Sequence, residues 1–473
     1  MVFSSIIFLL YFLPVFLLIY FFTPRNLKNY LILGFSTFFY AWGEPFFVFI
    51  LFGSTILDFY LVKEMDKSEG KKKKRLLAFS ILLNLGLLTY FKYANFFIEN
   101  VNSILESIGF TTIYWTKVLL PIGISFYTFQ TLTYSIDVYR KVHKPLNKVT
   151  DYLLYITMFP QLIAGPIVRY NEIAGQIESR NESGELRALG FYRFIIGLAK
   201  KVLLGNVMAE YAKELMSLND LTALDSGAAW VGITCYAFHI YFDFSGYSDM
   251  AIGLGKMMGF KFPENFNNPY ISKSITEFWR RWHITLGTWM RDYLYIPLGG
   301  NKVDKKSRLY FNLIFVFLIS GLWHGASWNF VIWGAFHGTF LILDRWFLGE
   351  VLEKIGSIPA TIFTFILVLI GWVFFEVKEF ADAILYIKTM FSFSFKEMDI
   401  FNNQEFVFTI IVCAFFSILT AFSFGKKLEN IVFGNSLSVK GMLLMTLISF
   451  ALFLLSISYI TSNGFNPFIY ERF

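Results

Sequence analysis

Two stretches of the chain place histidines among tryptophans. The first, residues 277–301, reads EFWRRWHITLGTWMRDYLYIPLGGN and contains His283. The second, residues 320–338, reads SGLWHGASWNFVIWGAFHG and contains His324 and His337. The chain has only 5 histidines in 473 residues, so these stretches hold most of them. Because an imidazole can gain or lose a proton near neutral pH, this window is the first candidate for proton-transfer chemistry.

His324 is the better candidate for a general base. It ends or interrupts an apolar helix at 321–325, and its neighbours in the sequence are Trp323, Trp328 and Trp333. Desolvation disfavours the charged form of a histidine, so His324 is expected to stay neutral. A neutral imidazole can take the proton from a hydroxyl while that hydroxyl attacks an acyl carbonyl. Trp323 and Trp328 are expected to support the site.

His283 is expected to assist this chemistry. The flanking cations Arg280, Arg281 and Arg291 favour its neutral form, which could donate to a developing oxyanion or hold the acceptor. The same three arginines could bind the phosphates of a coenzyme on the cytoplasmic side, since a guanidinium binds phosphate through two parallel hydrogen bonds. Anionic lipid headgroups would satisfy these charges equally well.

Other catalytic arrangements are not indicated. His337 lies 13 residues after His324, about 220° around a continuous helix, so packing is expected for it. No GxSxG, Walker A or HExxH pattern occurs, so a covalent serine nucleophile is not expected. His239 and Asp243 share a helix face, but no further ligands follow at a convincing spacing, and no metal is expected.

The composition defines the class of protein in which these residues work. Hydrophobic residues make up 56% of the chain and charged residues 16%, whereas soluble domains carry about 25% charged residues. Apolar runs of about 18 or more residues recur, and each can cross a bilayer. They lack strand-like alternation and predict helices. The expected fold class is all-α, a polytopic transmembrane helical protein with about 10–12 membrane segments, including re-entrant or broken helices.

The distribution of charge predicts the topology. Basic loops at 63–75 and 139–144 are expected in the cytoplasm, and residues 98–114 outside. The net charge of +7 fits basic loops that face anionic lipid, and no nucleic-acid partner is expected. These segments are expected within the apolar stretches 1–22, the two halves of 29–62 with a turn at 43–45, 76–97, 115–138, 152–170, 191–216, 230–258, 309–322, 328–347, 361–375, 405–422 and 442–460, not all of which are full spans.

We expect one membrane-embedded domain over residues 1–473. It would comprise N-terminal spans at 1–150, a catalytic core at 151–345 and C-terminal spans at 346–473. Within the core, Pro160, Gly165 and Pro166 interrupt the apolar run at 152–170. Such a break is tolerated at membrane depth where protein or a water-filled cavity covers the freed backbone groups. A kinked or re-entrant segment lining a cavity is therefore expected there.

Two carboxylates stand out inside an apolar helix. Asp243 and Asp249 lie within residues 230–258, and each would cost roughly 2.5–3.5 kcal/mol at the bilayer centre. They are expected to face the protein interior. Without further information, a transporter with a buried histidine and aspartate relay explains the intramembrane residues at least as well as an enzyme does.

The two tryptophan-rich blocks resemble the signature blocks of the membrane-bound O-acyltransferase family. They are similar in particular to its bacterial alginate O-acetyltransferase branch. The resemblance extends over nearly the whole chain, and the ending LGGN at Asn301 favours the acetylating branch. Further stretches fit the same branch: MVFSS at 1–5, QTLTYSIDVYR at 130–140, FPQLIAGPIVR at 159–169 and YFDFSGYSDMAIG at 241–253.

The resemblance implies an acyltransferase of the EC 2.3.1 type that works through a tunnel across the membrane. The essential histidine of the family falls on His324, and its second active-site histidine falls on His283. The implied donor is acetyl-CoA, a substrate from the cytoplasm and not a permanently bound cofactor. The implied acceptor is an extracytoplasmic polysaccharide such as alginate, reached through an SGNH-type acetyltransferase partner. A multi-pass protein of the bacterial plasma (inner) membrane, in contact with lipid, is therefore expected.

One alternative remains inside the family. Relatives that D-alanylate teichoic acid take their acyl group from a carrier protein. This chain could belong with them, and the donor then would not be acetyl-CoA.

Overall fold

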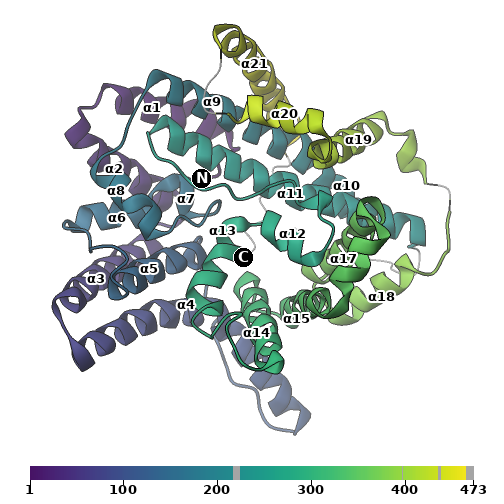
Figure 1. Ribbon diagram of the computed structural model, residues 1–473, viewed down its shortest axis with the longest axis horizontal. Helices are drawn as coiled ribbons and strands as arrows, with labels where there is room; N and C mark the ends of the chain where they lie inside the picture. The colour runs from purple at the N-terminus through teal and green to yellow at the C-terminus, as the bar shows by residue number, and fades with distance from the viewer. Residues whose placement is uncertain (217–223, 397, 435–437, 465–473) are drawn as a thin grey trace. The chain divides into compact units, whose positions relative to one another are not determined.

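The computed structural model describes residues 1–216, 224–396, 398–434 and 438–464. Within these ranges the chain forms helices and no strand (Figure 1), so the expected all-α fold is confirmed. The chain divides into two compact units. The first unit is Met1–Ser183 with Met258–Phe262, and the second is Gly184–Met257 with Pro263–Phe473.

The surface of the helices identifies a membrane protein. Segments long and apolar enough to cross a bilayer include Gly70–Ser107, Ser357–Glu376, Gln404–Ala421 and Val439–Ser462, and Phe8–Phe22 is a shorter apolar helix. Large apolar side chains lie exposed along several of these helices. In a soluble protein such surfaces would aggregate, whereas lipid solvates them.

The first unit contains a helical hairpin where proline breaks the second apolar run. Helix α2 ends at Gly43 and α3 begins at Phe47, which confirms the expected turn. The predicted basic loop at 63–75 is wrong: most of its lysines lie in the first turns of α4, where long basic side chains can remain solvated. The α-helices of this unit are α1 (Leu13–Phe22), α2 (Arg25–Gly43), α3 (Phe47–Lys67), α4 (Gly70–Ser107), α5 (Ile124–Tyr139), α6 (Val149–Thr157), α7 (Phe159–Leu162) and α8 (Tyr170–Glu178).

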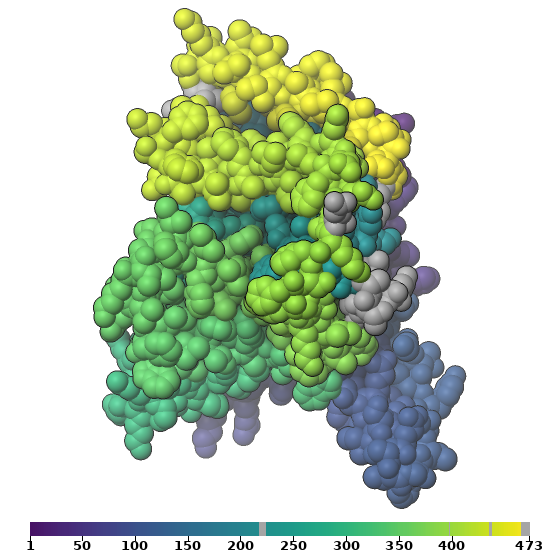
Figure 2. Space-filling model, turned by 90° about the vertical axis from the view of Figure 1, so that its right-hand side faces the viewer, coloured from purple at the N-terminus to yellow at the C-terminus, as the bar shows by residue number. Residues whose placement is uncertain are grey.

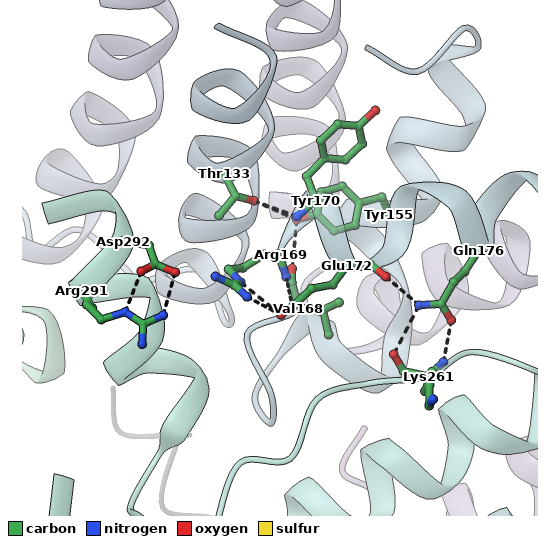
Figure 3. A network of polar contacts seen from close by, with 10 residues as sticks. All are labelled: Thr133, Tyr155, Val168, Arg169, Tyr170, Glu172, Gln176, Lys261, Arg291 and Asp292. Carbon is green, nitrogen blue, oxygen red and sulfur yellow. Dashed lines mark hydrogen bonds and ion pairs between the residues drawn. The ribbon is translucent and has the colours of Figure 1, made fainter. Parts of the chain in front are cut away.

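The expected broken segment is also present. Helix α6 ends at Thr157, the short α7 follows, and residues 163–169 are not helical. Neighbouring side chains bind the backbone groups that the break leaves unpaired. The hydroxyl of Tyr155 donates to the Val168 carbonyl at 2.9 Å, and the Tyr170 amide donates to the hydroxyl of Thr133 at 3.3 Å (Figure 3). The protein itself therefore solvates this backbone, as the interruption by proline and glycine requires.

A buried carboxylate joins four helices of the first unit. Asp58 on α3 is 0% exposed. It accepts hydrogen bonds from Ser80 at 2.5 Å and Asn84 at 3.2 Å on α4, from Ser135 at 3.3 Å on α5 and from Tyr152 at 2.7 Å on α6. Such a carboxylate is tolerated in an apolar interior because its oxygens are hydrogen-bonded. No sequence pattern singled it out.

The second unit carries both histidine-containing blocks. In Figure 2 its C-terminal helices α19–α21 form the yellow layer above the green helices α14–α18, with teal residues of α10 and α11 visible between them. A π-helical turn, Lys200–Asn206, joins α9 to α10. The α-helices are α9 (Gly184–Ala199), α10 (Val207–Leu215), α11 (Ser226–Met257), α12 (Ile275–Arg281), α13 (Ile284–Trp289), α14 (Lys306–His324), α15 (Trp328–Leu343), α16 (Gly349–Ile355), α17 (Ser357–Glu376), α18 (Phe380–Met390), α19 (Gln404–Ile418), α20 (Ser423–Val432) and α21 (Val439–Ser462).

Helices α9 and α11 pack backbone against backbone. A Cβ atom on Gly197 would lie 2.5 Å from the Gly246 carbonyl oxygen, and one on Gly190 would lie 2.6 Å from that of Gly253. Each helix thus presents two glycines seven residues apart to the other. In lipid, helices associate through such close packing of small residues, because no hydrophobic effect drives them together. This contact fixes the position of α11, the helix that carries Asp243 and Asp249.

Helices α14 and α15 form the second close pair (Figure 1). A Cβ atom on Gly321 would lie 2.1 Å from the Phe330 carbonyl oxygen, and one on Gly334 would lie 2.3 Å from that of Phe317. The chain leaves the helical conformation between His324 and Trp328. The glycines therefore bring the two helices together directly beside His324.

Candidate functional site

His324 is the last residue of α14 and lies in an aromatic pocket. Its side chain is 4% exposed. The imidazole centroid lies 4.8 Å from that of Trp323, 5.1 Å from Trp333 and 5.2 Å from Phe375, all edge to face. The rings come from α14, α15 and α17, so three helices hold this one side chain. The pocket shields the imidazole from water, as the sequence predicted.

His283 lies against the same tryptophan. It is 1% exposed, and its ring centroid is 6.1 Å from Trp323 and 4.8 Å from Phe244. The structure thus brings both histidines into contact with Trp323, although 41 positions separate them in the sequence. His283 sits before α13 with φ +44°, in the left-handed region. A backbone held there costs on the order of 1–3 kcal/mol and occurs preferentially at functional sites.

The side chain of Asn265 binds the His283 ring. Its Oδ1 lies 3.0 Å from Nδ1 of His283, 2.8 Å from the hydroxyl of Thr285 and 3.3 Å from the Thr285 backbone nitrogen. The Nδ2 group of Asn265 donates to Ser248 on α11 at 3.1 Å. One buried amide therefore links the histidine, the start of α13 and α11.

His337 is closer to the site than its spacing predicted. The predicted angle of about 220° assumed a continuous helix, but the chain breaks between α14 and α15. The break folds α15 back beside α14. As a result, the Trp333 ring contacts both His324, at 5.1 Å, and His337, at 5.0 Å. His337 thus belongs to the same aromatic cluster.

The two tryptophans expected to support the site differ in position. Trp323 is 4% exposed and contacts both catalytic candidates, His283 and His324. Trp328 begins α15 and is 59% exposed, so it lies outside the buried cluster. Trp333, one helical turn further on, occupies the buried position instead.

The three arginines expected at the donor phosphates have different surroundings. Arg281 pairs with Glu277 at 2.8 Å and donates to the Asn267 carbonyl at 3.0 Å. Arg291 pairs with Asp292 at 2.7 Å (Figure 3). Arg280 is exposed and has no ion pair with any residue the structure describes. Of the three, Arg280 has the charge that an incoming phosphate could bind without displacing a carboxylate.

The intramembrane carboxylates are held in ion pairs. Asp243 lies 3.1 Å from Lys201, and Asp249 lies 2.8 Å from Lys200 and 2.8 Å from Arg193. The adjacent lysines of the π-helical turn thus neutralise the two aspartates of the neighbouring helix. These pairs tie α9 and its π-helical extension to α11.

A cavity of about 810 Å³ lies in the second unit beside this network. Its polar wall is formed by the ion-paired groups and by the amide that holds His283. Its apolar wall comes from the C-terminal helices. The polar wall includes Arg193, Lys200, Ser248, Asp249 and Asn265, and the apolar wall includes Phe408, Phe416, Leu428 and Leu452. Asp249 thus lines a cavity, and so does Asn265, which binds the His283 ring. Asp243 is not among the residues that line it.

Sequence reasoning missed the residues that position the histidines. Asn265 lies in the loop FPENFNNPY, where three asparagines among prolines are typical of turns. Lys201 and Arg193 could have been found by pairing the charges of neighbouring apolar helices, because a buried carboxylate needs a cation. For Trp333, the helix break after His324 was the available signal.

Comparison with known proteins gives a consistent family assignment. Residues 69–349 match the model of the MBOAT, membrane-bound O-acyltransferase family. "Probable alginate O-acetylase AlgI" of Azotobacter vinelandii is 44% identical, with 83% of this chain and 78% of the relative covered. "Peptidoglycan O-acetyltransferase" of Helicobacter pylori is 38% identical, with 82% and 80% covered. "Teichoic acid D-alanyltransferase" of Bacillus subtilis is more distant, 30% identical over 55% of this chain and 69% of the relative.

Proposed function

Since this chain belongs to the membrane-bound O-acyltransferase family and is an acyltransferase, we propose that it moves acetyl groups from a cytoplasmic donor, acetyl-CoA, to an extracytoplasmic polysaccharide. The observation that carries this proposal is the pair His283 and His324 against Trp323, in a chain 44% identical to a relative named as an alginate O-acetylase. A protected pair of histidines suits transfer of an acyl group to a hydroxyl.

In the proposed reaction His324 is the general base. It takes the proton from the acceptor hydroxyl while the hydroxyl oxygen bonds to the acetyl carbonyl carbon. The bond from that carbon to the thioester sulfur then breaks. The departing thiolate accepts from His324 the proton that came from the hydroxyl. The aromatic pocket favours the neutral imidazole that the first step needs. It also excludes water, which would otherwise hydrolyse the thioester.

The donor is proposed to approach the basic segment around α12 and α13. Arg280 is exposed there with no carboxylate partner among the described residues, and a guanidinium binds phosphate well. Arg281 and Arg291 are already paired with carboxylates, so we propose a smaller part for them than for Arg280. Acetyl-CoA acts as a substrate in this scheme, and no permanently bound cofactor is required.

We infer the acceptor and the cellular location from the acetylating relatives. We propose a multi-pass protein in the plasma (inner) membrane of a bacterium, surrounded by lipid. The acetyl group would be delivered outside the cytoplasm to a polysaccharide such as alginate, through an SGNH-type acetyltransferase partner. Asp249, Lys200 and Asn265 line the cavity of about 810 Å³ and are proposed to form part of the passage.

A transfer assay with His324→Ala tests the mechanism. Membranes containing the protein receive acetyl-CoA labelled in the acetyl group, and label in the extracytoplasmic product is measured. Loss of a general base is expected to reduce the rate by about 10²–10⁴-fold. His143→Ala is the matched control, because His143 lies exposed in the first unit, and this variant should retain the wild-type rate.

A folded His324→Ala protein with the wild-type rate would exclude the proposed base. Folding is monitored by size-exclusion chromatography and thermal unfolding in detergent. The same membranes are also offered an acyl carrier protein charged with D-alanine. Label transferred from the carrier protein, and none from acetyl-CoA, would replace the acetyl donor with the alternative donor of the teichoic acid relatives.

The transporter hypothesis is not supported. The family assignment makes the chain an acyltransferase. The carboxylates that a relay would use, Asp243 and Asp249, are neutralised by Lys201, Lys200 and Arg193.

A further inference from the structure

The backbone amide of Thr285 determines the orientation of the Asn265 side-chain amide, because it can donate a hydrogen bond but cannot accept one. The backbone nitrogen of Thr285 lies 3.3 Å from one terminal atom of the amide. A backbone N–H only donates, so this atom must be the oxygen Oδ1. The other terminal atom, Nδ2, then points to the hydroxyl of Ser248, 3.1 Å away, which can accept.

This orientation determines which nitrogen of His283 carries the proton. Nδ1 of His283 lies 3.0 Å from Oδ1 of Asn265, and an amide oxygen only accepts. Nδ1 must therefore be protonated and donate. In the neutral ring the lone pair is then on Nε2, which is buried and has no hydrogen-bond partner among the described residues.

The partners of the ring agree with this assignment. Among the described residues its hydrogen-bond and aromatic partners are Asn265, the ring of Phe244 on α11 and that of Trp323 on α14. All three side chains are uncharged. The neutral form of His283, with its single proton on Nδ1, fits this environment.

We propose that Asn265 is a positioning residue that holds His283 as the Nδ1–H tautomer, so that Nε2 accepts a hydrogen bond from a substrate hydroxyl. This proposal rests on the proposed function, and it decides between the two roles considered for His283. A neutral ring protonated on Nδ1 has no proton on Nε2 to donate to an oxyanion. It can hold a second hydroxyl of the acceptor while His324 removes the proton from the attacking one.

The loop around Asn265 is built to keep this geometry. The Asn265 carbonyl accepts from the Ile284 amide at 2.9 Å, and the Asn267 amide donates to the Arg281 carbonyl at 2.9 Å. The Arg281 guanidinium in turn binds the Asn267 carbonyl at 3.0 Å. These contacts hold the left-handed backbone of His283, and they give Arg281 a structural role on this loop.

Nitrogen-15 NMR of histidine-labelled protein tests the tautomer directly. The chain has 5 histidines, so His283→Gln identifies the resonances of His283 by difference. The expected spectrum near neutral pH shows a protonated Nδ1 and an unprotonated Nε2. In Asn265→Leu this preference should be lost. A His283 protonated on Nε2 in the wild-type protein would overturn the proposal, whatever reaction the protein catalyses.

Steady-state kinetics test the consequence for acetyl transfer. Asn265→Leu is expected to lower kcat by about 10–100-fold, as does the loss of other groups that orient a working histidine, with a smaller change in KM. Asn265→Asp keeps the acceptor oxygen but adds a negative charge that stabilises the protonated ring. It should therefore restore much of the rate and move the acid limb of the pH–rate profile to higher pH.

A matched control tests whether any exchange of asparagine for leucine has this effect. Asn171→Leu alters an exposed amide of the first unit and should leave the rate and the pH profile unchanged. If His324→Ala is inactive but both Asn265 variants have wild-type kinetics, the role of Asn265 is wrong while the proposed function stands. If wild-type protein transfers no acetyl group, the proposed function fails, and the NMR spectrum still tests the tautomer.

Discussion

Lys201 and Asp243 form an ion pair of 3.1 Å in which the side chains are 1% and 0% exposed. Lys201 belongs to the π-helical turn after α9, and Asp243 lies in the middle of α11. Removing one partner leaves an uncompensated buried charge, which costs roughly 3–5 kcal/mol. We therefore expect Lys201→Met to lower the thermal unfolding temperature sharply in detergent.

The double variant provides the control for this prediction. Lys201→Met combined with Asp243→Asn removes both charges and retains the shape of the aspartate. It should be more stable than Lys201→Met alone, so the two effects are non-additive. Additive destabilisation would show that the pair does not stabilise the helix contact.

The contact between α9 and α11 should tolerate no side chain at its glycines. In Gly197→Ala the new methyl group would lie 2.5 Å from the Gly246 carbonyl oxygen, and such overpacking costs about 1–3 kcal/mol. The comparison variant is Gly86→Ala on α4, where nothing lies within 4 Å of the new Cβ atom. That variant should gain up to about 1 kcal/mol from helix propensity. Equal unfolding temperatures for the two variants would contradict the close approach.

The arginines of the basic segment should differ in their effect on the donor. Arg280→Gln removes an exposed charge without a carboxylate partner and should raise KM for acetyl-CoA about fivefold, the equivalent of roughly 1 kcal/mol. Arg291→Gln removes a charge already paired with Asp292 and should change KM less. Raising the ionic strength should weaken donor binding in wild type more than in Arg280→Gln. The reverse ranking would place the phosphates elsewhere.

The two tryptophans beside His324 should have unequal importance for stability. Trp323 is 4% exposed, and truncating a buried aromatic side chain typically costs about 3–5 kcal/mol. Trp328 is 59% exposed, so Trp328→Ala should change the unfolding free energy by less than about 1 kcal/mol. Urea unfolding of the two alanine variants in the same detergent measures the difference.

The sequence predicted the elements that depend on local chemistry. Apolar runs predicted the long helices, and Pro45 and Pro160 fall at the breaks that the structure shows. Boundaries were less accurate. Helix α4 continues through the lysines of residues 71–74, because their side chains can reach water while the backbone remains helical.

Contacts between distant segments could not be predicted in the same way. The angle between His324 and His337 was calculated for one continuous helix. The chain instead breaks after His324 and turns back, so that both imidazole rings contact Trp333. The partner of His283 lies in a loop whose composition indicates only turns, since the role of Asn265 depends on tertiary packing. Residue type and spacing singled out His324 and His283, whereas the hydrogen bond that orients His283 and the rings that enclose His324 required the structure.

The glycine contact between α9 and α11 also limits how the protein can move. If α9 slid along α11 by one residue, the side chain of Ile196 or Leu198 would meet the Gly246 backbone in place of Gly197. A shift of one residue is therefore opposed by steric clash, and we expect the two helices to move together as a pair.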